Sequence, residues 1–239
     1  MAPTIIITRP ERQSRAFANA LEAAHGASLP ILIAPLMRID PVAPATPIGP
    51  ARHVIFTSAN AVAQVARLGI DMDATAWCVG DQTAEAAEHA GFELTNAKGN
   101  SADLIAQIIA ARPIGPMIHL RGAHTTGGVA ETLRGAGLDC SETVVYAQSS
   151  CPPSPKLRAA LAGDTPVIAP LFSPRSARLF AESLPIRAPI TVVAISDAVA
   201  QAANQIRSID VILSNFPDKT AMIAATMRAF TGQCGRKTP

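Results

Sequence analysis

Short runs of isoleucine, valine and other apolar residues alternate along the chain with alanine-rich stretches of helical periodicity. Ile5-Ile6-Ile7 is the first such run and predicts a strand. In the stretch over 11–24 that follows, apolar positions such as Ala16, Ala20 and Leu21 recur at the spacing of one helix face. Strands made only of apolar residues are typical of parallel sheets covered by helices on both sides. The alternation therefore predicts an α/β protein with parallel sheets.

The same alternation continues almost to the end of the chain. Further strands are predicted over 29–36, 53–57, 76–79, 117–120, 143–148, 167–172, 190–195 and 211–213. Further helices are predicted over 59–68, 83–90, 102–111, 128–134, 156–162, 174–183, 198–207 and 219–230. Two proline-rich segments, 41–47 and 149–155, interrupt the pattern and are predicted to be extended connectors.

An internal repeat relates the two halves of the chain. Three segment pairs match: Phe56-Thr57-Ser58 with Leu171-Phe172-Ser173 at an offset of 115, Val79-Gly80-Asp81 with Ile195-Ser196-Asp197 at 116, and Thr8-Arg9-Pro10 with Leu120-Arg121-Gly122 at 112. Every match falls where a predicted strand ends and a helix begins, so together they indicate a duplication. Two similar α/β halves predict two domains, with a ligand cleft between them.

The balance of basic and acidic residues limits the kinds of molecule that the protein is expected to bind. The chain has 20 basic and 18 acidic residues, a net charge of +2, which disfavours a nucleic-acid-binding protein. Its 49% of apolar residues excludes a disordered chain. Arginine supplies 16 of the 20 basic residues. This excess has two explanations: recognition of carboxylates by the planar guanidinium, or a general bias of composition toward arginine, alanine and proline, which composition alone favours.

Compartment and metal content follow from the termini and the cysteines. The apolar start of the chain precedes its first charges, the reverse of a signal peptide, and no apolar run reaches the 18 residues of a membrane span. Cys78, Cys140, Cys151 and Cys234 form no C-x-x-C pair, and the histidines are isolated. We therefore expect a cytoplasmic protein with reduced thiols, no metal site and no contact with a membrane.

The strand-to-helix turns are the candidate binding site. Ligands of open α/β sheets bind beyond the carboxyl ends of the strands, where helix N-termini attract anions. Side chains at these turns suit carboxylates or phosphates, and the candidates are Arg9, Ser58, Asn60, Arg121, Ser173, Arg175 and Ser196. The alternative role of each serine is a helix N-cap, worth about 1 kcal/mol.

Familiar catalytic signatures are absent from the sequence. It has no G-x-G-x-x-G fingerprint, no P-loop and no G-x-S-x-G elbow, so no cofactor is expected. The sole tyrosine, Tyr146, ends a predicted strand just before the second connector. Such a tyrosine can donate a proton into a cleft, and it can equally be a packed ring with a solvated hydroxyl.

The motifs, taken in order, resemble those of the uroporphyrinogen-III synthase family. The matching segments are Ile7-Thr8-Arg9-Pro10, Ile55-Phe56-Thr57-Ser58-Ala59-Asn60-Ala61-Val62, Val79-Gly80-Asp81-Gln82-Thr83-Ala84, Ser101-Ala102-Asp103-Leu104, Leu120-Arg121-Gly122, Val144-Val145-Tyr146 and Phe172-Ser173-Pro174-Arg175-Ser176. The resemblance extends over about residues 4–228. It implies two flavodoxin-like domains joined by a two-stranded linker. We expect one domain to comprise 1–37 plus 150–230, the other 42–145, and a disordered tail 231–239.

The resemblance also implies a reaction: hydroxymethylbilane, a linear tetrapyrrole, is cyclised to uroporphyrinogen III with loss of water and inversion of ring D. No cofactor or metal takes part. By position, Tyr146 matches the tyrosine that assists departure of the hydroxyl group, and Ser58, Thr83 and Ser173 match hydroxyls implicated in binding. The expected protein is a monomer supplied by hydroxymethylbilane synthase.

One departure from the family pattern leaves alternatives open. Some relatives carry threonines in the second repeat where this chain has Asp197-Ala198-Val199, so no hydroxyl role transfers there. A non-catalytic two-domain protein that binds tetrapyrroles or other anions is the alternative function. An enzyme acting on a phosphorylated sugar also fits the turns but leaves Tyr146 and the ordered motifs unexplained.

Overall fold

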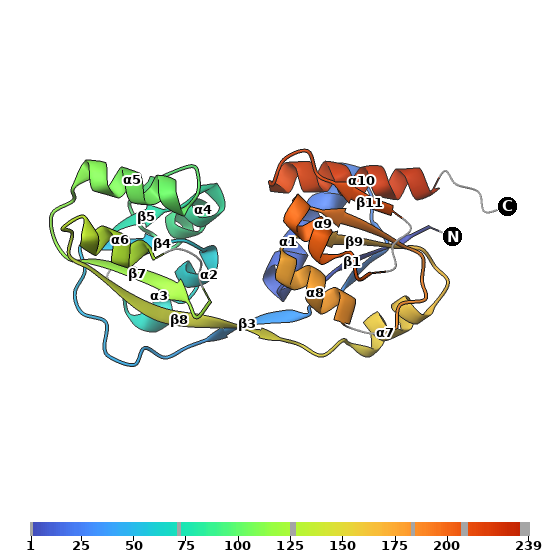
Figure 1. Cartoon of the computed structure of the whole chain (residues 1–239), viewed down its shortest axis with the longest axis horizontal. Helices are drawn as coiled ribbons and strands as arrows, with labels where there is room; N and C mark the ends of the chain where they lie inside the picture. The colour runs from blue at the N-terminus through green and yellow to red at the C-terminus, as the bar shows by residue number, and fades with distance from the viewer. Residues whose placement is uncertain (1, 71–72, 125–127, 183–184, 207–209, 235–239) are drawn as a thin grey trace. The chain divides into compact units, whose positions relative to one another are not determined.

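The computed structural model describes residues 2–70, 73–124, 128–182, 185–206 and 210–234. The chain forms two compact units: unit 1 combines Met1–Arg38 with Ser149–Pro239, and unit 2 is Ile39–Gln148. In Figure 1 the blue amino-terminal segment and the orange and red carboxyl-terminal segments share unit 1, and the green segments belong to unit 2.

The described part of unit 1 contains a sheet of five parallel strands in the spatial order β11-β10-β9-β1-β2. These strands are β1 (Thr4–Ile7), β2 (Ile31–Ile33), β9 (Val167–Leu171), β10 (Ile190–Ala194) and β11 (Asp210–Leu213). Numbered along the unit, their order is 2-1-3-4-5, which is the flavodoxin-like arrangement.

Helices cover both faces of this sheet (Figure 1). They are α1 (Glu11–His25), α7 (Pro155–Ala162), α8 (Pro174–Glu182), α9 (Asp197–Ala202) and α10 (Lys219–Cys234). Leu157, Phe180 and Val199 pack α7, α8 and α9 on one face. Phe17 and Met222 pack α1 and α10 on the other. Because both faces are covered, the inner strands β9 and β10 are fully buried and mostly apolar, as the sequence predicts, whereas the edge strand β11 is largely exposed and begins with Asp210.

The sheet of unit 2 has the order β3-β8-β7-β4-β5-β6 among the described residues, and the outer ends of β3 and β8 extend into residues of unit 1. Its strands are β3 (Met37–Pro41), β4 (His53–Phe56), β5 (Thr75–Cys78), β6 (Leu94–Asn96), β7 (Met117–Gly122) and β8 (Cys140–Ser150). All neighbours from β8 to β6 are parallel. The helices are α2 (Ala59–Val62), α3 (Val65–Leu68), α4 (Asp81–His89), α5 (Ser101–Ala111) and α6 (Val129–Gly135).

Two apolar layers enclose the sheet of unit 2. Val62, Val65 and Ala87 pack α2, α3 and α4 on one face. Leu104 and Leu133 pack α5 and α6 on the other. Both units are therefore three-layer α/β structures with mainly parallel sheets, which confirms the predicted fold class.

The internal repeat corresponds to equivalent strands. The matched segments lie at the ends of β1, β9 and β10 in unit 1 and of β7, β4 and β5 in unit 2. Equivalent strands have the same spatial order, β10-β9-β1 and β5-β4-β7. Along the chain, however, the first of these strands in unit 2 is β4 and not β7. When the strands from β4 to β8 are numbered along the chain, their spatial order is 3-2-1-4-5, and β3 is added at the edge beside β8. Unit 2 is thus a circular permutation of the flavodoxin-like arrangement.

The structure differs from the sequence prediction at both connectors and at the tail. Strand β8 continues to Ser150 because it pairs with β3, a strand that the residue pattern did not predict, although the resemblance implies a two-stranded linker. Cys151 N–H donates to Leu36 C=O and Val42 N–H to Val145 C=O, so the pairing is antiparallel. Helix α10 includes 231–234, which were expected to be disordered. Residues 235–239 and the expected helix ends at 183 and 207 lie outside the described residues.

Candidate functional site

Each unit has a topological switch point at the carboxyl ends of two adjacent strands. In unit 2, β4 leads into α2 on one face of the sheet, whereas β7 leads into α6 on the other. In unit 1, β9 leads into α8 and β1 into α1, again on opposite faces. Adjacent strands whose connections diverge in this way leave room for a ligand in open α/β sheets.

The predicted residues divide between these two edges. Unit 2 holds Ser58 and Asn60 after β4, Thr83 in α4, Arg121 in β7 and Tyr146 in β8. Unit 1 holds Arg9 after β1, Ser173 and Arg175 around the start of α8, and Ser196 before α9. Asn60 and Arg175 occupy equivalent positions of the repeat and are both half-buried.

Tyr146 lies against Gly122 at the end of β7. The strand register passes from the pair Arg121–Val144 to the pair Gly122–Tyr146, so Val145 is an additional, bulged residue of β8. A Cβ atom on Gly122 would lie 2.7 Å from Cζ and 2.9 Å from the hydroxyl oxygen of Tyr146. Tyr146 is 7% exposed and its ring belongs to the apolar core of unit 2, so the ring is packed, and the absence of a side chain at Gly122 leaves space for its hydroxyl end beside the end of β7.

Arg9 is held by an aromatic ring in unit 1. Its guanidinium carbon lies 4.1 Å from the ring centroid of Phe172, which itself meets Phe17 edge to face at 4.9 Å. Burial lowers the pKa of Arg9 below its ordinary value. An arginine remains protonated in proteins, so this is a partly desolvated, permanently positive group, which strengthens its attraction for an anion.

The three serines differ in what their hydroxyls do. Ser58 Oγ accepts from Asn60 N–H at 3.2 Å, and Ser173 Oγ accepts from Ser176 N–H at 3.1 Å. Both are therefore helix N-caps, the alternative role considered for them. Ser196 occupies the N-cap position of α9, but its side chain makes no capping hydrogen bond. Its hydroxyl is therefore not engaged in a cap, unlike those of Ser58 and Ser173.

Arg121 and Thr83 are less open to a ligand than the sequence suggested. Arg121 Nε lies 2.8 Å from Glu142 Oε2, and Arg121 Nη1 donates to the Gly122 carbonyl. Its charge is thus already balanced by a carboxylate 21 residues away. Thr83 is buried in the first turn of α4, with 6% of its surface exposed.

Sequence reasoning missed a buried polar pair beside this edge. His119 in β7 is 1% exposed, and its Nε2 lies 3.1 Å from Thr57 Oγ1. Burial lowers the pKa of His119 to about 4, with a further lowering by Arg121 that opposes the effect of Glu142. Its Nδ1 has no hydrogen-bond partner among the described residues. The isolated spacing of the histidines offered no signal for this pair.

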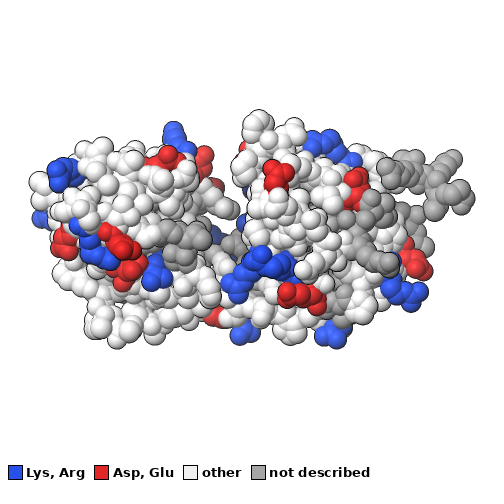
Figure 2. Space-filling view, viewed as in Figure 1, with Lys and Arg blue, Asp and Glu red and all other residues white. Residues whose placement is uncertain are grey.

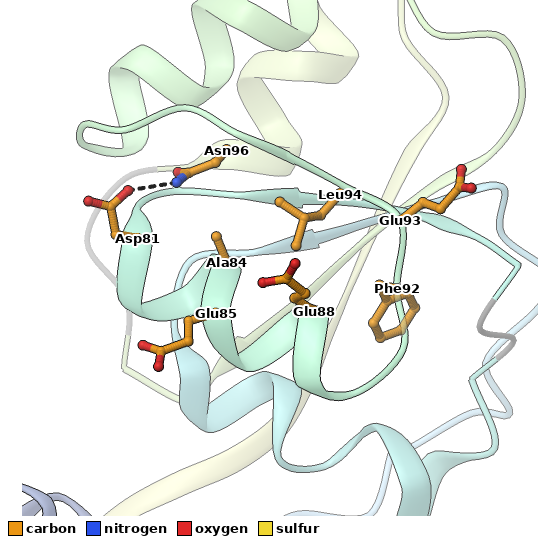
Figure 3. A pocket seen from close by; sticks show the side chains of 8 residues that line it. All are labelled: Asp81, Ala84, Glu85, Glu88, Phe92, Glu93, Leu94 and Asn96. Atoms are coloured by element: carbon orange, nitrogen blue, oxygen red, sulfur yellow. Dashed lines mark hydrogen bonds between the residues drawn. The ribbon is translucent and has the colours of Figure 1, made fainter.

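A separate pocket of unit 2, about 730 Å³ in volume, has the wrong charge for an anion (Figure 3). It is lined by Asp81, Glu85, Glu88, Glu93 and Asn96, among others. Asn96 Nδ2 donates to Asp81 Oδ1 at 2.7 Å across its end. Elsewhere charges of both signs are interspersed among neutral residues, as Figure 2 shows for one face. The strand ends with Arg9 and the serines therefore remain the candidate site for an anionic ligand.

Fold and site together define a duplicated, two-unit α/β protein with hydroxyls and arginines near the carboxyl ends of its strands and one buried tyrosine beside the end of β7. The sequence profile of uroporphyrinogen-III synthase HemD matches residues 15–224. The chain belongs to the uroporphyrinogen-III synthase family. None of the helices in the described ranges has the length and apolar character needed to cross a membrane.

A solved structure shows the same fold. Uroporphyrinogen-III synthetase from Helicobacter pylori 26695 is 16% identical with a TM-score of 0.68, and the match covers 96% of this chain and 100% of that one. A mutant uroporphyrinogen III synthase from the extremely thermophilic bacterium Thermus thermophilus is 16% identical over 97% of this chain and 100% of its own, with a TM-score of 0.49. Among curated proteins, none matches the sequence.

Proposed function

We propose that this protein is a cyclising lyase that converts hydroxymethylbilane into uroporphyrinogen III with loss of water and inversion of ring D. The observation that carries the proposal is the position of Tyr146 in a chain of this family. Tyr146 is the only tyrosine of the sequence, and its hydroxyl end lies over Gly122 at the end of β7, one of the two strands of the switch point. A proton donor at a place where α/β proteins bind ligands supports a dehydration.

In the proposed mechanism, Tyr146 donates a proton to the hydroxymethyl group of the substrate, which leaves as water. The electron-rich pyrrole supplies the electron pair that expels this group, and an azafulvene results. The substituted carbon of ring D attacks the azafulvene, which gives a spiro intermediate. This intermediate then rearranges to the product with ring D inverted. Uncatalysed closure gives the other isomer, so the main task of the protein is to hold one folded conformation of the chain.

Eight carboxylates of the substrate would be held by the candidate residues at the strand ends. We assign to binding the residues Arg9, Ser58, Asn60, Thr83, Arg121, Ser173, Arg175 and Ser196. Charge-assisted hydrogen bonds from guanidinium, hydroxyl and backbone N–H groups are the strong interactions available to a carboxylate. Among these, Arg9 and Ser196 are supported best, because the first is desolvated and the second makes no capping bond.

The proposal also covers the compartment, the oligomeric state and the source of the substrate. We propose a cytoplasmic monomer, and the free thiols Cys78, Cys140 and Cys151 accord with a reducing compartment. Hydroxymethylbilane synthase would supply the substrate directly. A substrate that closes spontaneously to the wrong isomer favours a short transit between the two enzymes.

The decisive experiment couples the purified protein to hydroxymethylbilane synthase and separates the oxidised products by chromatography. We expect the type III isomer in excess over the type I isomer formed without the protein. Type I product alone would refute the proposal. If only type I product formed and the protein still bound hydroxymethylbilane in a titration, the two results together would support the alternative of a binding protein without turnover.

A further inference from the structure

The peptide bond that precedes Tyr146 is held by two donors. Val145 is the bulged residue of β8, and its carbonyl accepts from Val42 N–H at 2.9 Å and from Arg67 Nη2 at 3.4 Å. The Val145 side chain is fully buried in the core of unit 2. Because the Val145–Tyr146 peptide is planar, the direction of its carbonyl constrains the direction in which the Tyr146 side chain leaves the backbone.

Arg67 joins this bulge to two other segments of unit 2. Its Nη2 also donates to the Val42 carbonyl at 2.9 Å, directly after β3. Its Nε donates to Gln64 Oε1 at 3.3 Å, and Gln64 Nε2 lies 3.5 Å from the Asn60 carbonyl at the edge of hydrogen-bonding distance. One guanidinium thus connects α3, the segment after β3 and the bulge of β8.

We propose that Arg67 is a positioning residue for Tyr146. Arg67 holds the carbonyl of the bulged residue Val145, and Gly122 leaves space for the tyrosine ring, so the hydroxyl stays at the end of β7. The inference rests on the proposed function for the catalytic role of Tyr146; the positioning itself stands on the contacts. Arg67 makes these bonds from two nitrogens, Nη2 and Nε, held in one rigid plane, whereas a lysine would donate from one nitrogen on a flexible stem.

The chain offers a matched control for this proposal. Arg134 in α6 donates to the Cys140 carbonyl at 2.8 Å, at the opposite end of β8. Arg134 and Arg67 are both exposed, so Arg134→Ala and Arg67→Ala each remove one surface charge and a hydrogen bond to a carbonyl of this strand, and Arg67→Ala also removes the bonds to Val42 and Gln64. Only Arg67→Ala removes a contact at the bulge.

The first measurement is the NMR spectrum of protein labelled with ring-13C tyrosine, in which Tyr146 gives the only tyrosine signals. We expect Arg67→Ala to move these signals toward those of free tyrosine, Arg67→Lys to move them part of the way, and Arg134→Ala to leave them in place. Unchanged tyrosine signals in folded Arg67→Ala would overturn the proposal. Circular dichroism and Trp77 fluorescence establish that each variant is folded.

The second measurement is turnover of hydroxymethylbilane. We expect kcat of Arg67→Ala to fall about 10- to 100-fold with KM unchanged, since misplacement of a reacting group by about 1 Å can cost that much. Full activity of Arg67→Ala beside shifted tyrosine signals would overturn the link between positioning and catalysis. An inactive wild-type protein would instead refute the proposed function, while the NMR result would still decide the positioning of Tyr146.

Discussion

His119 Nε2 and Thr57 Oγ1 form a hydrogen-bonding pair 3.1 Å apart inside unit 2, where the duplicated positions of unit 1 hold Ile7 and Phe172. A polar pair thus replaces an apolar one at the same place in the fold. Burying a histidine costs free energy when it is protonated, so this replacement makes unit 2 sensitive to acid in a way that unit 1 is not at this position.

The free energy of unfolding of unit 2 should fall between pH 6.5 and pH 4. The pKa of His119 is about 4 in the folded protein and 6.5 as its ordinary value. The unfolded state therefore binds more protons in this range, and stability rises with pH across it, by on the order of 3 kcal/mol in total. Denaturant titrations followed by the fluorescence of Trp77, the sole tryptophan, measure this directly.

His119→Leu is the control for that dependence. Other groups titrate alike in both proteins, so the stability of the wild type relative to His119→Leu should decrease as the pH falls through the window. A difference that is independent of pH would contradict a neutral, buried His119.

Gly122→Ala should displace Tyr146. The new Cβ would approach three atoms of the tyrosine side chain to within 3 Å, which costs about 1–3 kcal/mol of overpacking. We expect turnover to fall by on the order of 100-fold. Gly135→Ala in α6 is the matched change, because its Cβ would meet nothing within 4 Å, and it should keep full activity. Equal activity of the two variants would show that the ring position does not matter.

Ser196→Ala and Ser173→Ala should separate binding from folding. Ser173 caps α8, so its loss should cost about 1 kcal/mol of stability. Ser196 makes no capping bond, so its loss should change stability by less than about 0.5 kcal/mol. If Ser196 binds a substrate carboxylate, KM should nevertheless rise about tenfold. Thermal denaturation and steady-state kinetics test both; an unchanged KM would remove Ser196 from the site.

Glu142→Gln should release Arg121 for the substrate. The pair is partly exposed and worth about 0.2–1 kcal/mol, so KM should fall by up to about fivefold. Glu93→Gln removes the same charge from the acidic pocket of unit 2 and should leave KM unchanged. A KM that does not respond to Glu142→Gln would indicate that Arg121 serves the ion pair and not the ligand.

Local patterns in the sequence predicted most strands and helices, because buried parallel strands must be apolar and surface helices periodic. Long-range pairing was beyond them. Strand β3, Met37–Pro41, forms because it pairs with β8. Its own residues end at the first proline of segment 41–47, which predicts a connector and not a strand. The permuted chain order of unit 2 likewise follows from tertiary contacts and not from local propensity.

The candidate site shows the same division. The repeat located Arg9, Arg121 and Ser173 at strand ends, since equivalent turns share residue types. The partners of these residues decide their chemistry: Phe172 for Arg9, Glu142 for Arg121 and Ser176 for Ser173. Each partner is a side chain chosen by the folded packing, and no spacing in the sequence distinguishes it from its neighbours.

The interruption of unit 1 by unit 2 sets the order in which a nascent chain can fold. Unit 2 is one continuous stretch and can form while the ribosome is still making the rest. Strand β1, whose Ile5, Ile6 and Ile7 are fully buried in the finished protein, can pair early with β2 but has to wait for β9 as its second neighbour. Until then one edge of β1 lacks its neighbouring strand, and an unpaired apolar edge is the kind of surface that aggregates or recruits chaperones.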